Sequence, residues 1–309
     1  MPPSLATTLC GISLKNPVIA ASGTYAYGVE FKDLVDLNAL GGIVVKGLSR
    51  EAMDGNPPPR LYETEAGMIN SVGLQNIGVR AFVQEKLPDL RNFKTAVIAN
   101  VFGYAVEDYV EVAKVLEGAE GVAAYELNVS CPNTRHGGIF FSSDPLLLDE
   151  VVRAVRRVTR RPLIVKLSPN VTRIEPLARA AVEAGADAIS LINTVVALGI
   201  DARTRRPRLG AGFGGLSGPA IKPIALRMVY EAAQAVKIPV IGLGGIANGT
   251  DAAEFLIAGA SAVQVGTVNF WDPSAPLRIA RELGGFLKQE NLSDVSHLVG
   301  TLRFKKGDQ

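Results

Sequence analysis

The chain has 309 residues, of which 48% are hydrophobic and 20% charged, and its 32 Lys and Arg nearly balance its 30 Asp and Glu. The net charge of +2 gives no electrostatic basis for nucleic-acid binding, and no apolar run reaches the ~20 residues of a membrane-spanning helix. With 2 Cys and 2 His, neither a disulfide framework nor a metal site is expected. Since nothing at the N-terminus resembles an export signal, we expect a soluble cytoplasmic protein. A chain of this length can bury a core that is stable without cross-links.

Short apolar runs rich in β-branched residues recur along the chain, and each is followed by small or polar residues and then by a helix-like pattern. This alternation is typical of the strands of a parallel β/α protein. The predicted strands are 17–21, 42–46, 96–100, 124–128, 163–166, 188–192, 239–243 and 262–265.

Capping residues mark the helices between these strands. Asp144 is a predicted N-cap with Pro145 at the first helical position, a combination that starts helices. The segments 175–184 and 250–258 also have helical spacing of apolar residues. Gly185 and Gly259, which follow them, are predicted to end these helices in a left-handed conformation.

Eight strand–helix units in one chain favour a (β/α)8 TIM barrel over a doubly wound sheet. The intervals after the second, fourth and sixth strands are clearly longer than the others, so they predict insertions at the carboxyl ends of those strands. Active sites of such barrels are built at this face. We therefore predict one α/β domain, residues 1–309, with insertions after strands 2, 4 and 6.

Polar residues end most of the predicted strands, where a barrel directs side chains into one shared pocket. Two of them, Lys46 and Lys166, follow strongly apolar runs, and a charge at the edge of a buried strand is costly unless an opposite charge meets it. We therefore predict an anionic ligand. The full set is Ser22, Lys46, Asn100, Asn128, Lys166, Asn193 and Gly244.

Small residues follow the seventh and eighth strands, namely Gly244, Gly245, Gly266 and Thr267. The loops at these positions are the usual phosphate site of a TIM barrel, because backbone N–H groups approach the phosphate closely there. The alternative is that glycine merely permits tight turns. We favour a phosphorylated cofactor or substrate.

Cys131 lies in a polar stretch beyond the fourth strand, between Asn128 and Asn133. A thiol in such a loop is a candidate general base, although a lone cysteine is more often an inert small apolar residue. Cys10, near the N-terminus, is predicted to be structural. His136 has no acidic neighbour in the sequence, and its role stays open, as does that of the basic segment 203–208.

Six motifs together resemble the dihydroorotate dehydrogenase family, over residues 9 to 270. The resemblance is to class 1, because class 2 has Ser at the position of Cys131 and an N-terminal helical extension. The segment 210–223 is most like class 1B. The motifs are Asn70-Ser-Val-Gly-Leu-Gln-Asn76, Asn128-Val-Ser-Cys-Pro-Asn133, Val165-Lys-Leu-Ser-Pro169, Ile192-Asn-Thr194, Gly214-Gly-Leu-Ser-Gly-Pro-Ala-Ile-Lys-Pro223 and Gly242-Leu-Gly-Gly-Ile246.

The resemblance implies a flavin enzyme with one FMN per chain. It implies that the FMN phosphate is held by Gly218, Gly244, Gly245, Gly266 and Thr267, and that the rest of the cofactor contacts Ser22, Lys46, Gly47, Asn100, Asn128, Lys166 and Ile192. The implied substrate contacts are Lys46, Asn70, Ser71, Val72, Gly73, Leu74, Asn128, Asn193 and Thr194. These groups suit an anionic ring that forms many hydrogen bonds.

The reaction implied is the oxidation of (S)-dihydroorotate to orotate in de novo pyrimidine (UMP) biosynthesis. Cys131 would remove the proton from C5 while hydride leaves C6 for N5 of FMN, and Lys166 would stabilise the charge of the reduced ring. Class 1B catalytic subunits pass electrons to NAD through a partner that carries FAD and an iron–sulfur cluster. A homodimer, or a heterotetramer with such a partner, is therefore implied, without nucleic acid or membrane.

Two other functions remain open from the residues alone. One is a different FMN barrel reductase, acting on free pyrimidine bases or on tRNA uridine, although a net charge of +2 disfavours tRNA. The other is a barrel without redox chemistry that binds a phosphorylated ligand. If the purified protein is yellow, the barrel without redox chemistry is excluded. The substrate that bleaches the yellow colour then distinguishes another FMN barrel reductase from dihydroorotate dehydrogenase. The physiological electron acceptor, fumarate or NAD, is not decided by the sequence.

Overall fold

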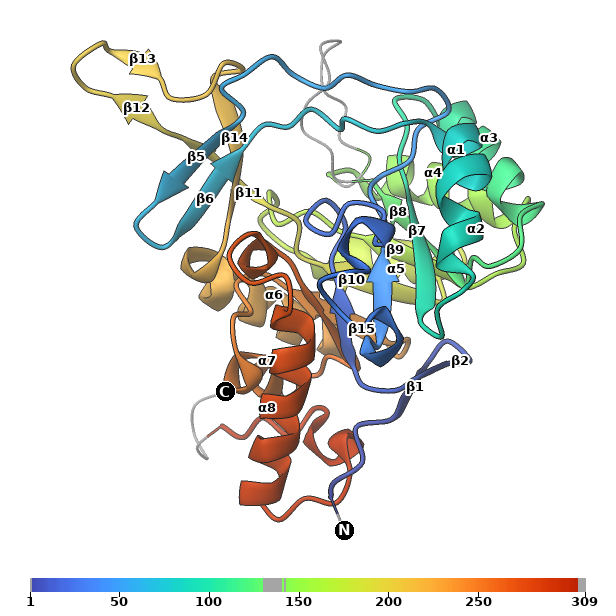
Figure 1. The fold of residues 1–309 in the computed structure, drawn as a ribbon, viewed down its shortest axis with the longest axis vertical. Helices are drawn as coiled ribbons and strands as arrows, with labels where there is room; N and C mark the ends of the chain where they lie inside the picture. The colour runs from blue at the N-terminus through green and yellow to red at the C-terminus, as the bar shows by residue number, and fades with distance from the viewer. Residues whose placement is uncertain (1, 130–140, 142, 305–309) are drawn as a thin grey trace.

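The computed structural model describes residues 2–129, 141 and 143–304 (Figure 1). Eight parallel strands close into a barrel in the order β10-β15-β16-β3-β4-β7-β8-β9. Each overlaps one predicted strand, which confirms the TIM barrel. Their bounds are β3 Val18–Ala20, β4 Gly42–Val44, β7 Ala96–Val101, β8 Ala124–Asn128, β9 Leu163–Lys166, β10 Ala188–Leu191, β15 Val240–Leu243 and β16 Ala262–Val265.

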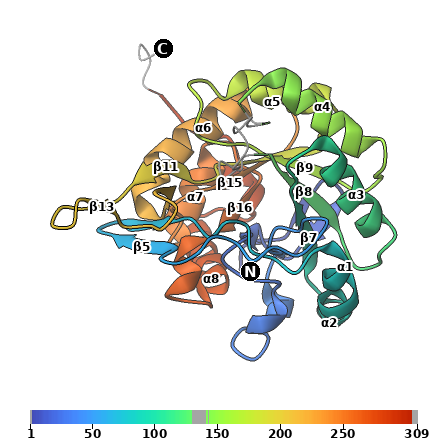
Figure 2. The same cartoon turned by 90° about the horizontal axis from the view of Figure 1, so that it is seen from above.

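Helices surround the barrel strands (Figure 2). The longer ones are α3 Val106–Glu117, α4 Pro145–Arg156, α5 Glu175–Glu183, α6 Lys222–Ala235, α7 Gly249–Ile257 and α8 Ala275–Gln289. A contiguous segment between β4 and β7 is formed by α1 Val79–Ala81, the π-helical η3 Phe82–Lys86 and α2 Leu87–Leu90. Short 3-10 helices are η1 Val29–Phe31, η2 Leu37–Ala39, η4 Pro219–Ile221, η5 Thr267–Phe270 and η6 Val295–Leu298.

The predicted helix caps are confirmed. The Asp144 carboxylate accepts a hydrogen bond from the Leu146 N–H at 2.8 Å, so it satisfies one of the free donors at the start of α4. Gly185 and Gly259 follow α5 and α7 with φ angles of 105° and 118°. These angles lie in the left-handed region that glycine adopts without steric cost.

The barrel interior is layered. Near the amino ends of the strands an apolar layer contains one residue from each strand, and the hairpin of β1 (Thr7–Leu9) and β2 (Ile12–Leu14) covers it with Leu9 and Leu14. Because side chains alternate along a strand, the residue two positions later also points inward, one layer closer to the carboxyl ends. Ile98, Ala124, Ile164, Ala188 and Ala262 of the apolar layer are followed at that spacing by Asn100, Glu126, Lys166, Ser190 and Gln264. Lys46 follows Val44 in the same way, whereas Ala21 and Leu243 follow Ile19 and Ile241, so the second layer is mostly polar.

An additional four-stranded antiparallel sheet stands at the carboxyl ends of the barrel strands, in the order β11-β14-β6-β5. The strands β5 (Leu61–Thr64) and β6 (Gly67–Asn70) follow β4, whereas β11 (Val195–Leu198) and β14 (Phe213–Ser217) follow β10. The hairpin of β12 (Ile200–Asp201) and β13 (Arg206–Pro207) protrudes beyond this sheet (Figure 1). The interval after β8, where the sequence predicts the insertion after the fourth strand, lies largely outside the described residues.

Candidate active site

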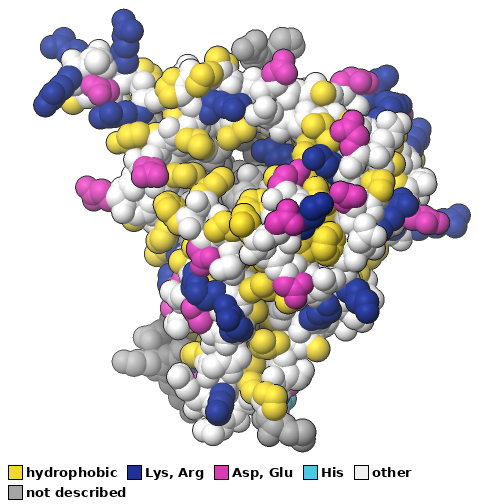
Figure 3. Space-filling view, viewed as in Figure 1, with side chains coloured by type: hydrophobic (Ala, Val, Ile, Leu, Met, Phe, Trp, Pro, Cys, Tyr) yellow, Lys and Arg dark blue, Asp and Glu magenta, His cyan; other side chains and the backbone are white. Residues whose placement is uncertain are grey.

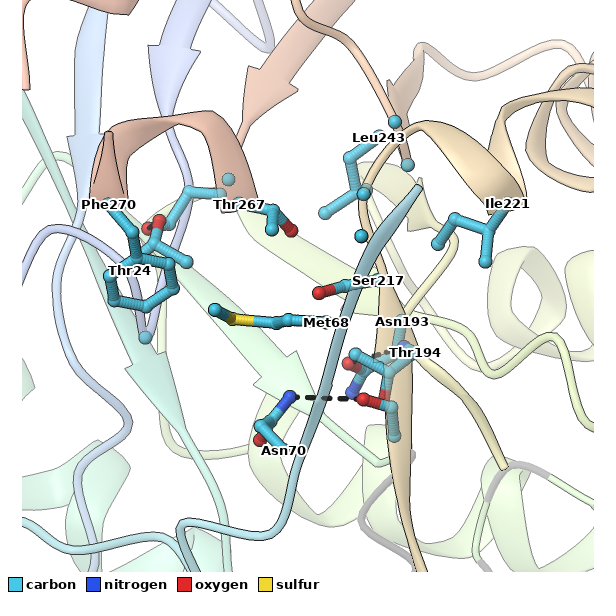
Figure 4. A pocket seen from close by; sticks show the side chains of 18 of the residues that line it. Thr24, Met68, Asn70, Asn193, Thr194, Ser217, Ile221, Leu243, Thr267 and Phe270 are labelled. Atoms are coloured by element: carbon cyan, nitrogen blue, oxygen red, sulfur yellow. Dashed lines mark hydrogen bonds between the residues drawn. The ribbon is translucent and has the colours of Figure 1, made fainter. Parts of the chain in front are cut away.

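A cavity of about 480 Å³ opens at the carboxyl ends of the barrel strands and extends to the additional sheet. Figure 4 shows side chains from both parts around it, including Thr267 and Leu243 from the barrel side and Met68, Asn70 and Ser217 from the sheet. All the residues predicted to contact the cofactor line this cavity. They are Ser22, Lys46, Gly47, Asn100, Asn128, Lys166, Ile192, Gly218, Gly244, Gly245, Gly266 and Thr267.

The residues predicted to contact the substrate also line the cavity, with one exception. Lys46, Asn70, Val72, Gly73, Leu74, Asn128, Asn193 and Thr194 are all in its wall. Ser71 is not: its side chain is buried, and its N–H donates to the carbonyl oxygen of Arg60 at 2.8 Å. Cys131 lies outside the described residues, so its role stays a prediction, as does that of Ser71.

The amides at the cavity wall are held in place by hydrogen bonds from neighbouring elements. Asn70 Nδ2 donates to the carbonyl oxygen of Gly215 in β14 at 3.3 Å, and Asn193 Nδ2 donates to Asn128 Oδ1 at 3.4 Å. The Thr194 N–H donates to Asn193 Oδ1 at 2.8 Å. Three asparagines from different elements are thus oriented around one space, as Figure 4 shows for Asn70 and Asn193.

Lys166 differs from the expectation that only a ligand would balance its charge. Its ammonium nitrogen lies 3.6 Å from Glu126 Oε1, and the Glu126 side chain is fully buried. The protein therefore supplies an opposite charge for Lys166 itself. For this lysine, strand position alone does not require an anionic ligand, because the carboxylate on the neighbouring strand already supplies an opposite charge.

Lys46 does fit that expectation. Burial lowers the pKa of its ammonium group below the usual 10.5, and the nearby positive charge of Arg60 lowers it further. Among the described residues no carboxylate forms an ion pair with Lys46, and the side chain lines the cavity. An anion bound beside Lys46 would remove an electrostatic penalty that the folded chain otherwise bears.

The glycines after β15 are required by their backbone conformation and by close contacts. Gly244 and Gly245 have φ angles of 129° and 77°. A Cβ on Gly245 would lie 2.8 Å from the carbonyl oxygen of Gly218 and 3.0 Å from the nitrogen of Lys222. Gly266 is different, since a Cβ there would meet nothing nearer than 3.7 Å. Close contacts therefore explain Gly244 and Gly245 but not Gly266, which lines the cavity.

Sequence reasoning missed Glu126 and Gln264, which lie in the polar layer of the barrel. Both are polar residues at inward positions of otherwise apolar strands, in Ala-Tyr-Glu-Leu-Asn and Ala-Val-Gln-Val, and that exception was the available signal. It also missed Phe270 and Trp271, which line the cavity mouth and are about half exposed. No pattern in the sequence singled out these two aromatic residues.

Binding of nucleic acid, of a metal ion or of a membrane would each require particular features of the surface or of its side chains. Acidic and basic side chains are interspersed over the face in Figure 3, apart from the basic tip at hairpin β12–β13. In the part of the chain that is described, no group of three or more His, Cys, Asp or Glu is placed to hold a metal ion. Within the same residues, no helix has the length and apolarity needed to cross a membrane.

Comparisons with known proteins identify the family. The family model described as dihydroorotate dehydrogenase matches residues 4–287. A protein of Solibacter usitatus named putative dihydroorotate dehydrogenase A (fumarate) is 75% identical over 98% of this chain and 100% of its own length. Two proteins named dihydroorotate dehydrogenase B (NAD(+)), catalytic subunit, from Geobacter sp. strain M21 and Thermodesulfovibrio yellowstonii, are each 54% identical over 97% of this chain. They are covered over 98% and 99% of their own lengths.

A solved structure supports the fold. The crystal structure of DHODH in complex with ferulenol from Eimeria tenella superposes with a TM-score of 0.80 at 22% sequence identity, covering 96% of this chain and 88% of that one. The barrel, the cavity at its carboxyl end and the match along almost the whole sequence agree, and the chain belongs to the dihydroorotate dehydrogenase family.

Proposed function

We propose that this chain oxidises (S)-dihydroorotate to orotate, a step of de novo pyrimidine biosynthesis, with FMN as its cofactor. One observation carries the proposal. In a chain of this family, a single cavity gathers every described residue predicted to contact the flavin, together with a partly buried lysine, Lys46, that lacks a carboxylate partner among the described residues.

The residues of the cavity fit FMN. Gly244 and Gly245 form a compact turn whose backbone a phosphate can approach, with Gly218, Gly266 and Thr267 around it. At the floor, the side-chain oxygens of Asn100 and Gln264 are buried without a hydrogen-bond partner among the described residues, as expected where a bound ring supplies donors. Ser22, Gly47, Asn128, Lys166 and Ile192 complete the set. When bound, FMN supplies the hydride acceptor.

The chain's own side chains bind and orient the substrate. The Lys46 ammonium group attracts the carboxylate of dihydroorotate, and the amides of Asn70, Asn128 and Asn193 match the ring's alternating N–H and carbonyl groups. Leu74 and Val72 contribute apolar wall beside them. Such a ring is thereby held in one orientation, which is what a transfer between fixed atoms requires.

Cys131 and Lys166 complete the chemistry. The Cys131 thiolate would take the proton from C5 of dihydroorotate, the hydride on C6 would pass to the bound FMN, and a carbon–carbon double bond would form between C5 and C6. Positioned bases of this kind contribute about 10²–10⁴-fold to rate. Lys166 holds its positive charge at the floor of the cavity, where it stabilises negative charge that develops above it.

The proposal also covers the electron acceptor and the partner subunit. The segment 210–223 supports NAD as acceptor, reached through a partner subunit that carries FAD and an iron–sulfur cluster. The relative of 75% identity has fumarate in its name, whereas those of 54% identity are named NAD(+) catalytic subunits. We further propose a homodimer, joined by that partner into a heterotetramer. The 2 cysteines in 309 residues support a reducing, cytoplasmic location.

The test is spectroscopic. The purified chain is expected to carry one FMN per protein molecule, and dihydroorotate added without oxygen should bleach the flavin absorbance within one turnover. Dihydrouracil and NADPH are the matched controls, and neither should bleach it. Bleaching by either control instead of dihydroorotate would indicate another FMN barrel reductase, and a colourless protein that binds phosphate would contradict redox chemistry altogether.

A further inference from the structure

A fully buried carboxylate lies beneath the cavity, in the polar layer of the barrel. Glu126 extends from β8 and has an exposed side-chain fraction of 0%. It accepts hydrogen bonds from Asn100 Nδ2 at 2.8 Å and from Gln264 Nε2 at 2.6 Å. Ser190 Oγ donates to it at 2.9 Å, and Lys166 Nζ lies 3.6 Å away. Four other barrel strands therefore direct a donor at one side chain.

An ionised carboxylate accepts hydrogen bonds but donates none, and the Lys166 ammonium group supplies the opposite charge that this ionised form needs here. The two amides beside Glu126 consequently have only one acceptable orientation. Asn100 and Gln264 must turn their NH2 groups toward the carboxylate. Although amide nitrogen and oxygen are similar in shape, this chemistry decides between them.

The same constraint fixes what the two amides present to the cavity. With both NH2 groups facing Glu126, the oxygens Asn100 Oδ1 and Gln264 Oε1 are left over, and both are buried without a hydrogen-bond partner within the described part of the chain. Both residues line the cavity. Since buried polar atoms are almost always paired in folded proteins, these oxygens are placed to accept hydrogen bonds from a ligand.

We propose that Glu126 is a positioning residue that sets the polarity of the cavity floor, so that Asn100 and Gln264 accept hydrogen bonds from an N–H group of the bound ring. The inference rests on the proposed function, in which that ring is FMN. The oxidised isoalloxazine ring has a single N–H, at N3 between two carbonyl groups. Glu126 would therefore select a ring with a free imide N–H without contacting it.

The test compares FMN with 3-methyl-FMN, which lacks this N–H. The full-length chain is stripped of flavin, and the dissociation constant of each flavin is measured by fluorescence quenching, without any turnover. The wild-type chain should prefer FMN. In Glu126→Gln the new side chain offers its own NH2, so one amide must turn and present a donor to the cavity. The preference should fall by about tenfold, as when one buried hydrogen bond is left unmade.

The ratio of the two constants separates positioning from a purely structural role. The steric cost of the methyl group is common to every variant, and a general loosening of the barrel weakens both flavins alike. Ser190→Ala is the matched control, because it removes another buried hydrogen bond to Glu126 but no amide, and it should keep the wild-type ratio. Glu126→Asp, which retains an acceptor-only carboxylate, should restore much of the preference.

A second variant keeps the test decisive if Glu126→Gln does not fold. Gln264→Leu removes one of the two unpartnered oxygens and leaves the buried ion pair intact, and it should lower the same ratio. An unchanged ratio in either folded variant, or a wild-type chain that does not discriminate between the flavins, would overturn the inference. A wild-type chain that binds neither flavin would instead contradict the proposed function.

Discussion

Lys46 and Lys166 both line the cavity, but they differ in what balances their charge. Lys166 has Glu126 at 3.6 Å, whereas the pKa of Lys46 is lowered by burial and by Arg60. Substitution of the two lysines is therefore expected to affect orotate binding and protein stability differently.

Orotate binding should depend on the protonation of Lys46. If the carboxylate of orotate binds the charged ammonium form, as proposed, the affinity for orotate is highest below the pKa of the free enzyme's Lys46 and declines as pH rises through it. Because that pKa lies below 10.5, the decline should begin at a lower pH than for an exposed lysine. Titration of orotate against flavin absorbance between pH 7 and 10 measures this.

Lys46→Met should weaken orotate at neutral pH by about tenfold or more, the range of a lost hydrogen bond to a charged group, and should remove the alkaline decline. Lys32→Met, at an exposed position, is the matched control. It should leave the affinity for orotate and the alkaline decline of that affinity unchanged. If the alkaline decline persisted in Lys46→Met, another group would be responsible for it.

The stability of the flavin-free protein should change differently at the two lysines. Lys166→Met leaves the fully buried Glu126 without its opposite charge, which costs about 3–5 kcal/mol when a buried ion pair is broken. Lys46→Met removes a partly buried charge that has no ion-pair partner among the described residues, so it should not destabilise the fold. Urea denaturation of the two variants gives the comparison, and equal losses would contradict the difference in pairing.

The two cysteines should also differ in their reactivity and in the effect of their substitution on flavin reduction. Burial and the charge of Asp187 raise the pKa of Cys10 to about 11, and its Sγ donates to the Asp187 carbonyl oxygen at 3.3 Å. At neutral pH it therefore remains a protonated, unreactive thiol. Cys131→Ser should keep FMN but slow flavin reduction by dihydroorotate about 10²–10⁴-fold, with partial recovery at high pH. In Cys10→Ser the flavin should be reduced at the wild-type rate. Single-turnover mixing of the two variants with dihydroorotate therefore tests the assignment of Cys131 as the general base.

At the scale of elements, strands and helices could be predicted because each carries its own signal. The strands are apolar and β-branched, and helix α4 begins with Asp144 and Pro145. The additional sheet could not be predicted in this way. Its central pair joins β6 to β14, with Ile69 opposite Leu216, and nothing local indicates a pairing across so much of the chain. The polar layer inside the barrel had a local signal, polar residues at inward positions of apolar strands, but its pairing had none, since Glu126 finds its partners only once five strands have come together.

Two helical glycines offer a test of packing at this scale. Gly285 lies at an exposed position in α8, where a Cβ would meet nothing within 4 Å. Gly249 begins α7, where a Cβ would lie 2.5 Å from Glu282 Cβ and 2.6 Å from the backbone of Glu282 and Leu283. The first glycine is replaceable, and the second permits α7 to pack closely on α8.

Gly285→Ala should stabilise the protein by about 0.5–1 kcal/mol, because glycine within a helix has excess conformational freedom when unfolded. Gly249→Ala should destabilise it by about 1–3 kcal/mol, because the added methyl group forces two helices apart. Chemical denaturation of both variants measures the two free energies of unfolding. Stabilisation by Gly249→Ala would mean that the contact between α7 and α8 yields more easily than its distances indicate.

At the scale of the whole molecule, the open question is where the electrons go after dihydroorotate is oxidised. The cavity has aromatic residues at its mouth, Phe270 and Trp271, which are 50% and 55% exposed. A flavin bound in this cavity could be reoxidised by a small acceptor or by a protein partner. The names of the relatives include both an enzyme that uses fumarate and catalytic subunits that use NAD(+).

Reoxidation of the dihydroorotate-reduced chain distinguishes these acceptors. If the chain is a class 1B catalytic subunit, neither NAD nor fumarate should restore the flavin absorbance of the isolated chain, and NAD should do so once a flavin and iron–sulfur subunit is added. Dihydroorotate reduction itself should be equally fast with and without that subunit, because the residues assigned to it all belong to this chain. Rapid reoxidation of the isolated chain by fumarate would instead place it with the fumarate-linked enzymes. In that case the oxidation half of the mechanism would stand, and only the second half-reaction, with its partner, would be replaced.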